Sequence, residues 1–218
     1  IKQKMVMKRE VIADKGIWTA KKRYILNVLD EEGITFDEPK LKIMGIEAVK
    51  SSTPEVCRGK IKQAIKLIMT KGEDELQAFV ADFKQEFYQM TAEQISFPRS
   101  CNNLKKYKHS SNIFIKGTPI HVKGALIYNQ QLQQRKLHRK YPIIQEGDKI
   151  KFLKLKEANP FKFDVISYVT KLPTEFALQE YIDYDLMFQK TFLDPMSFIL
   201  NSIGWEYEKT ASLEAFFD

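Results

Sequence analysis

The sequence has 218 residues, 44% of them hydrophobic, and a formal net charge of +7. This length bounds the chain to one or two domains, and the hydrophobic fraction is enough to build a buried core. No apolar run approaches the roughly 18 residues of a membrane span, and no signal peptide opens the chain. We therefore expect a folded, basic protein with no membrane partner.

The elements expected first along the chain form a small antiparallel sheet over residues 23–49. Residues 23–30 and 34–36 flank the acidic turn Glu31–Gly33, which predicts a hairpin, and residues 40–49 add a further apolar run. A helix should follow, with Thr53 as its N-cap and Pro54 at its first helical position.

Two amphipathic helices are expected next. Apolar residues recur at near-helical spacing up to Lys71–Gly72 and again after it. The two predicted apolar faces consist of Val56, Ile61, Ile65 and Ile68, and of Leu76, Phe79, Val80, Phe83 and Phe87. We expect both faces to pack in the core.

The second half of the chain mixes helices and strands. Residues 100–112 read as a loop and residues 120–133 as a helix. The strand at 148–156 should pair with residues 163–169, and two helices are expected near 174–190 and 195–203. The chain is predicted to be α+β, with a boundary near Lys50 between a small sheet and a larger mixed unit.

Basic residues are concentrated in two segments. No aspartate or glutamate occurs from Gln94 to Gln145, and the first 23 residues are also strongly basic. The acid-free segment carries Arg99, Lys105, Lys106, Lys108, Lys116, Lys123, Arg135, Lys136, Arg139 and Lys140. Concentrated positive charge attracts polyanions, so nucleic acid is favoured over a merely solvated basic surface.

No catalytic or metal-binding motif stands out. Cys57 and Cys101 leave one disulfide open, although we expect two free thiols, and the histidines show no zinc-like spacing. Asp183 and Asp185 lie two residues apart in a predicted helix, where their side chains point in different directions. The residues alone predict a nucleic-acid-binding α+β protein. An RNA-binding protein is disfavoured because no stacking aromatics in a sheet are evident.

Several motifs together resemble family B DNA polymerases. "KKRY" after Trp18-Thr19 and "EPKLKIMGIEAVKSSTP", then "NPF", "DYDLMFQKTFLDP" and "YEKTASLEAFFD", are similar to the C-terminal quarter of the replicative polymerases of T-even-type phages. The resemblance implies a palm-derived sheet at 1–49, a mostly helical thumb with a small β insertion at 50–205, and a tail at 206–218. Because the chain opens on Ile1, we expect a piece of a longer chain or a subunit of a split polymerase.

The resemblance also implies contacts to duplex DNA. Lysines and serines can reach phosphates or minor-groove acceptors without reading sequence, and a helix N-terminus favours phosphate. The residues expected at DNA are Lys21, Lys22, Arg23, Tyr24, Lys50, Ser51, Ser52, Ser100, Asn102, Asn103, Lys106, His121, Lys123 and Lys190. Asp194 stands where relatives are expected to carry a basic residue, which puts one backbone contact in doubt.

The tail resembles the clamp-binding peptide of replication proteins. Leu213, Phe216 and Phe217 place large apolar groups in a short segment, and Thr210 replaces the glutamine of the fuller motif. Exposed apolar surface of this kind favours a covering partner, although a turn docked on its own domain is the alternative.

These features predict part of a DNA-directed DNA polymerase that grips primer–template DNA and a sliding clamp. The expected partners also include the remainder of the polymerase, in the cytoplasm of an infected bacterial host. No metal site is expected here, because Mg²⁺ would be held by carboxylates elsewhere in the complete enzyme, so this chain alone should be inactive. The alternative is a separately encoded DNA-binding or processivity subunit without a polymerase partner.

Overall fold

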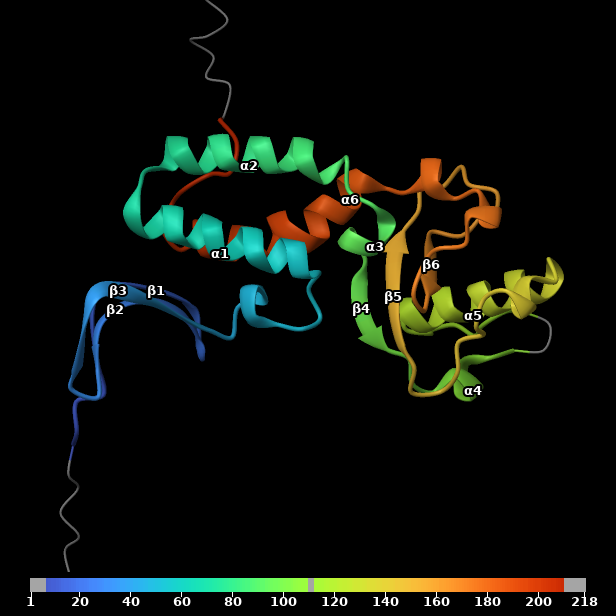
Figure 1. The fold of residues 1–218 in the computed structure, drawn as a ribbon, viewed down its shortest axis with the longest axis horizontal. Coiled ribbons are helices and arrows are strands. Elements are labelled where there is room, and N and C mark those ends of the chain that lie inside the picture. The colour runs from blue at the N-terminus through green and yellow to red at the C-terminus, as the bar shows by residue number, and fades with distance from the viewer. Residues whose placement is uncertain (1–6, 110–111, 210–218) are drawn as a thin grey trace, which may run out of the picture.

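The computed structural model describes residues 7–109 and 112–209, and it shows an α+β fold (Figure 1). Of the two three-stranded antiparallel sheets, the first lies at the lower left of the view, below the long helices α1 (Glu55–Thr70) and α2 (Glu73–Phe87), and the second lies right of centre, beside α5 (Ile120–Gln134). The expected fold class is confirmed: a small antiparallel sheet comes first, and a larger unit of helices with a second small sheet follows.

The first sheet has the order β1-β2-β3, with β2 in the centre. Its strands are β1 (Val11–Ala20), β2 (Arg23–Glu31) and β3 (Ile34–Met44). The predicted β2–β3 hairpin is confirmed, but residues 40–44 continue β3, and the third strand is β1, which we did not predict. Within β1 only Ile17 is buried, so its sequence lacks the alternation that marks a half-buried strand.

The two faces of this sheet have different surroundings. Ile17, Ile25 and Ile43 are cross-strand neighbours, and the first two are buried in the core. The next cross-strand row contains Trp18, Tyr24 and Met44, in which Trp18 is 65% exposed and Met44 46% exposed. Because successive side chains of a strand point to opposite faces, the sheet packs on the helices through the isoleucine row.

Helices α1 (Glu55–Thr70) and α2 (Glu73–Phe87) bury the apolar faces predicted for them. The exceptions are Val56 and Phe79, which are only partly buried. The predicted start of α1 is wrong by one residue, because Pro54 occupies the N-cap and Thr53 makes no side-chain capping bond. Arg58 N donates to the Pro54 carbonyl, so the first helical bond already closes on the proline.

The helices near the C-terminus differ from their prediction. Residues 174–183 contain two short 3₁₀ turns, and Asp183 caps the start of α6 (Tyr184–Phe188) by accepting from Leu186 N. A π-helical stretch over Gln189–Leu193 joins α6 to α7 (Asp194–Asn201), so the two expected helices become one interrupted rod. The π stretch ends just before Pro195, whose ring nitrogen cannot donate a helical hydrogen bond.

The second sheet has the order β4-β5-β6 and is covered by α5 (Ile120–Gln134). The expected pairing of β5 (Lys149–Lys154) with β6 (Val165–Tyr168) is confirmed, as is α5. Strand β4 (Phe97–Ser100) was not predicted, and the expected loop that follows it contains the short helix α4 (Leu104–Tyr107). The four-residue helix α3 (Ala92–Ile95) leads into β4.

Cys57 and Cys101 are buried free thiols, as expected. Burial raises the pKa of each to about 11, so neither is a reactive thiolate at neutral pH. No helix within the described ranges is both long and apolar enough to cross a membrane.

Candidate nucleic-acid interface

The "KKRY" segment forms the tight connection between β1 and β2. Lys21 and Lys22 are exposed in the turn, whereas Arg23 and Tyr24 are half-buried at the start of β2. Lys22 has a φ of 64°, in the left-handed region that non-glycine residues seldom occupy. The turn therefore presents two lysine side chains at the end of the sheet where β3 also finishes.

The exit of β3 packs directly against this turn. A Cβ atom on Gly45 would lie 2.5 Å from the Lys22 carbonyl oxygen, and Gly45 itself has a φ of 69°. Only glycine fits both requirements. The close approach ties the "KKRY" turn to the segment that leads into Lys50 and α1.

The "KSS" segment lies at the N-terminus of α1. Lys50 Nζ donates to Glu47 Oε1 at 2.6 Å, Ser51 is exposed, and the Ser52 carbonyl accepts a 2.9 Å hydrogen bond from Arg99 Nη1. A cavity of about 640 Å³ opens here between the start of α1 and the edge of β4 and β5, with Ser51 and Lys151 among its lining residues. Its lining holds both cations, Arg58 and Lys151, and acids, Glu55 and Glu93, so the helix N-terminus is the feature here that favours a phosphate.

Arg99 is the residue that links this segment to the second sheet. It lies on β4, next to Ser100, and its charge is among the causes that lower the pKa of His121, after burial. Desolvation lowers the pKa of Arg99 itself. The sequence marked Arg99 only as one of ten cations in the acid-free segment. Its position 47 residues from Ser52 gave no local signal of their contact.

The segment from the end of β4 through α4 exposes Ser100, Asn102, Asn103 and Lys106. Its shape is set by Glu146, whose carboxylate accepts the backbone N–H groups of Asn103 and Leu104. Glu146 is the first acidic residue after the acid-free segment. A carboxylate outside that segment therefore fixes the backbone at residues 103–104 inside it.

The cluster His121, Lys123 and Gly124 lies in the first turns of α5, where it packs on β6. Ser167 Oγ donates to the His121 carbonyl at 2.8 Å, and a Cβ on Gly124 would lie 2.5 Å from that same Oγ. Lys123 Nζ contacts Asp164 Oδ1 at 2.7 Å, and Lys154 Nζ contacts Oδ2 of the same aspartate at 2.6 Å, so the two lysines share one carboxylate. These contacts give the cluster a packing role, and the half-buried His121 ring is the member on which the charge of Arg99 acts.

Lys190 lies apart from these clusters, in the π-helical stretch between α6 and α7. Its Nζ atom pairs with Asp194 Oδ2 at 2.8 Å. Burial raises the pKa of Asp194, but hydrogen bonds from Lys190 and Gln189 outweigh it and hold this pKa below its ordinary value. Asp194 therefore pairs with the lysine that the sequence predicts at the DNA, which makes Lys190 less available to a phosphate.

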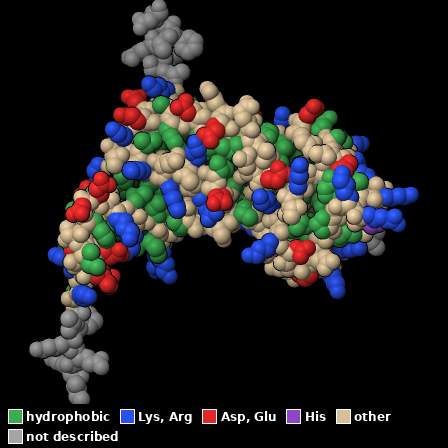
Figure 2. Space-filling view, in the orientation of Figure 1, with side chains coloured by type: hydrophobic (Ala, Val, Ile, Leu, Met, Phe, Trp, Pro, Cys, Tyr) green, Lys and Arg blue, Asp and Glu red, His purple; other side chains and the backbone are tan. Residues whose placement is uncertain are grey.

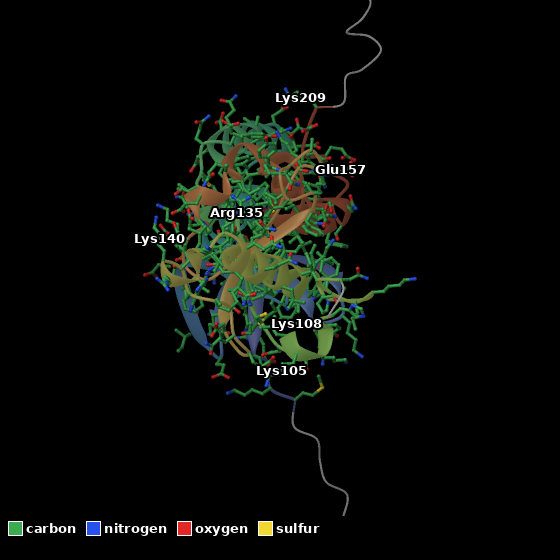
Figure 3. The ribbon with its side chains drawn as sticks, turned by 90° about the vertical axis from the view of Figure 1, so that its right-hand side faces the viewer. Lys105, Lys108, Arg135, Lys140, Glu157 and Lys209 are labelled. Carbon is green, nitrogen blue, oxygen red and sulfur yellow. The ribbon has the colours of Figure 1, made fainter. Side chains whose placement is uncertain are left out.

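Four of the ten cations of the acid-free segment bond to acceptors in the protein: Arg99 and Lys123, described above, and Arg135 and Lys140. Arg135 donates to the backbone carbonyl of Glu175, and Lys140 donates to the carboxylate of the same residue. Folding thus brings an acidic residue from outside the segment next to two of its cations. Six others form no ion pair with residues that the structure describes: Lys105, Lys106, Lys108, Lys116, Lys136 and Arg139. Basic side chains gather at the right-hand end of the molecule (Figure 2), and Figure 3, which faces that end, shows Lys105 and Lys108 in its lower part.

Asp183 and Asp185, the two aspartates with Asp-x-Asp spacing, each accept a hydrogen bond from another residue of the protein. Asp183 caps α6, and Asp185 accepts from the Tyr88 hydroxyl. Within residues 7–109 and 112–209, no three His, Cys, Asp or Glu side chains cluster as metal ligands. The residues of the predicted clamp-binding peptide, Leu213, Phe216 and Phe217, lie outside the described part of the chain.

Comparison with known proteins gives a clear relationship. The chain matches no protein-family model. It is 35% identical over 206 residues to the DNA-directed DNA polymerase of Enterobacteria phage T4, covering 93% of this chain and 22% of that polymerase. It is 38% identical over 227 residues to that of Escherichia phage RB69, covering 98% of this chain and 25% of that polymerase. The chain is therefore homologous, over almost its whole length, to about a quarter of the T4 and RB69 DNA polymerases.

Proposed function

We propose that this chain is the C-terminal palm and thumb portion of a replicative family B DNA polymerase. The observation that carries the proposal is the 35–38% identity to two phage polymerases across nearly the whole chain. In this assignment residues 1–49 complete the palm, residues 50–205 form the thumb and residues 206–218 form the tail.

The function assigned to the body of the chain is to hold primer–template duplex. Contacts and short chain connections link four of the five predicted clusters: Gly45, five residues before Lys50, packs on Lys22; Arg99 bonds Ser52; Ser100 follows Arg99; and the charge of Arg99 acts on His121. These groups recognise phosphates and acceptors present at every base pair, which suits an enzyme that copies any sequence. Lys123 and Lys190 are weaker candidates because each is already paired with an aspartate.

The function assigned to the tail is to bind the sliding clamp. Each buried aromatic side chain would contribute about 1.5–3 kcal/mol before the cost of ordering the segment. Nucleotidyl transfer belongs to the complete enzyme in this proposal, where Mg²⁺ would lower the barrier to phosphoryl transfer. The chain alone is then a DNA- and clamp-binding part without polymerase activity.

Duplex binding by the whole chain tests the proposal. We expect sequence-independent binding whose affinity falls steeply between low and moderate salt, because phosphate contacts release counterions. Binding that barely weakens over that range would contradict the phosphate contacts. Primer extension should appear only when the remaining three quarters of a polymerase is added. A chain that binds duplex DNA but never supports extension would favour the separately encoded DNA-binding subunit.

A further inference from the structure

The last described residues form a strap across α2. We define the strap as residues 205–209. Two hydrogen bonds hold its backbone on α2, from Glu206 N to Glu73 Oε1 at 2.6 Å and from Gln77 Nε2 to the Glu206 carbonyl at 3.1 Å. Trp205 and Tyr207 pack against the hydrophobic core. The chain therefore leaves the folded body at a fixed place beside α2.

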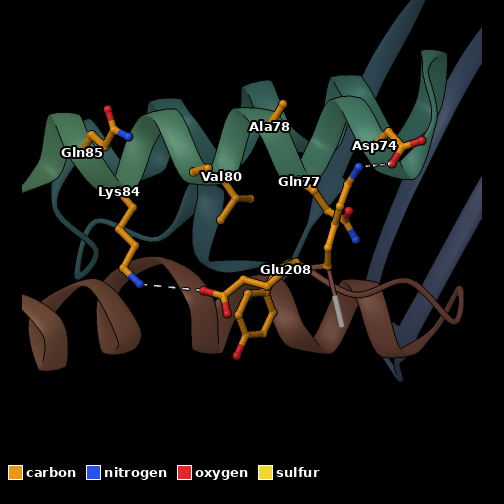
Figure 4. Close-up of a pocket in the computed structure, with 10 residues that line it drawn as sticks. Asp74, Gln77, Ala78, Val80, Lys84, Gln85 and Glu208 are labelled. Carbon is orange, nitrogen blue, oxygen red and sulfur yellow. Dashed lines mark ion pairs between the residues drawn. The ribbon is translucent and has the colours of Figure 1, made fainter. Parts of the chain in front are cut away.

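An open pocket of about 530 Å³ lies between α2 and the strap (Figure 4). Ala78, Val80, Ala81 and Tyr207 are among its lining residues, and the lining is predominantly apolar. Two ion pairs lie at its rim, Lys84–Glu208 at 3.7 Å and Lys209–Asp74 at 3.2 Å.

The chemistry of this pocket fits a protein surface rather than DNA. The four rim charges cancel in pairs, which leaves no surplus cation for a phosphate. A neighbouring hollow at the start of α2 is lined by four acids, Glu73, Asp74, Glu75 and Glu206, against one cation, Lys209, and this negative balance would repel a nucleic-acid backbone. An uncharged apolar hollow with a polar rim is instead the usual composition of the core of a protein interface.

The length of chain between the strap and Leu213 limits how far from α2 a protein that binds the tail can lie. Leu213 is four residues beyond Lys209, and a fully extended chain covers at most about 3.5 Å per residue. A protein that holds Leu213 must therefore approach within about 14 Å of the strap. Any folded partner of ordinary size would then face α2.

We propose that the protein bound by the tail also packs on the α2–strap pocket and inserts an apolar side chain between Ala81 and Tyr207. The inference rests on the proposed clamp-binding role of the tail. It makes the pocket a second contact, beside the peptide, with the sliding clamp. The two contacts are linked by a short spacer, so they act together through a high effective concentration.

The experiment compares the whole chain with a synthetic peptide of residues 209–218 for binding to the sliding clamp of the same genome. We expect the whole chain to bind about tenfold more tightly than the peptide, because it adds the second contact. Ala81→Arg should bring the whole chain down to the affinity of the peptide, since the guanidinium fills the pocket. Ala81 is exposed on α2, so this variant should stay folded, and Ala78→Arg repeats the test at a second lining position.

A matched control is Gln63→Arg, which adds the same charge on the exposed side of α1, outside the pocket. It should leave clamp binding unchanged. Equal affinities of peptide and whole chain, or no effect of Ala81→Arg, would overturn the second contact. Tighter clamp binding by Ala81→Arg would also overturn it, because the tail itself would then occupy the pocket. If Phe216→Ala with Phe217→Ala leaves clamp binding intact, the proposed role of the tail fails instead.

Discussion

Arg99 Nη1 donates a 2.9 Å hydrogen bond to the carbonyl oxygen of Ser52, which joins the edge of the second sheet to the residues just before α1. The same nitrogen also donates to the Pro98 carbonyl at 3.1 Å. A single partly desolvated guanidinium thus holds together two segments that the proposed function assigns to the DNA backbone.

Arg99→Met should weaken duplex binding by roughly tenfold, about 1.4 kcal/mol, because the "KSS" segment loses its anchor to β4. Since the Nη1 bonds go to protein carbonyls, the main effect should be on affinity and not on the slope of affinity against salt. Fluorescence anisotropy over a salt series measures both. Lys116→Met, which removes an exposed charge outside this contact, is the control; an equal loss in the two variants would argue against a special role for Arg99.

Lys22→Gly should separate charge from backbone conformation at the "KKRY" turn. Glycine adopts the positive φ of this position without strain, so the midpoint of thermal unfolding should not fall. Duplex binding should weaken, and its log–log slope against salt should decrease by about 1, as for the loss of one phosphate contact. Lys140→Ala is the comparison, because Glu175 already neutralises that amine. Comparable binding defects in the two variants would remove the special role of Lys22.

Asp194→Asn should strengthen duplex binding if it is the aspartate that silences Lys190. Asparagine keeps a hydrogen-bonding oxygen for Gln189 while it removes the negative charge beside the lysine. The expected change is a several-fold gain in affinity at low salt that disappears as salt screens the site. Filter binding at two salt concentrations measures it. Lack of any gain would place Lys190 away from the DNA.

Gly124→Ala should destabilise the fold by about 1–3 kcal/mol, because the new methyl group would meet Ser167 at the α5–β6 contact. Gly59→Ala is the matched control in α1, where a Cβ would have no neighbour within 4 Å. That exchange should stabilise the protein by about 0.5–1 kcal/mol through helix propensity. Urea unfolding of both variants provides the comparison, and a similar change in both would show that the close approach at Gly124 is not tight.

Asp164 should contribute to stability in a pH-dependent manner. Partial burial raises its pKa, but hydrogen bonds from Lys123 and Lys154 outweigh burial and lower the pKa from 3.8 to about 2. A lowered folded-state pKa gives a contribution that is complete above 3.8 and is lost as pH falls through about 2. Because the side chain is half exposed, Asp164→Asn should cost only about 1 kcal/mol at pH 7. This difference in unfolding free energy should shrink towards zero near pH 2, and a constant difference would exclude the linkage.

The local pattern of the sequence determined the two long helices and the β2–β3 hairpin. The buried residues of α1 and α2 recur at helical spacing, and the turn at Glu31–Gly33 separates two apolar runs. Each of these patterns is formed by residues close together in the sequence, so no tertiary information was needed to recognise it. Strand β1 was missed because it has little buried surface, although it pairs with the next strand along the chain. Strand β4 was missed because it has only four residues and is defined by pairing with β5, about 50 residues away.

The charge pattern likewise predicted a basic protein but not which cations remain available. Lys123 is 41 residues from the aspartate that pairs with it, and Lys140 is 35 residues from Glu175. Coulomb attraction depends on distance in space and on local solvent, not on separation along the chain. Only the tertiary structure therefore decided that Lys21 and Lys22 stay exposed in a turn, that Lys123 pairs with Asp164, and that Arg99 on β4 bonds to the segment before α1.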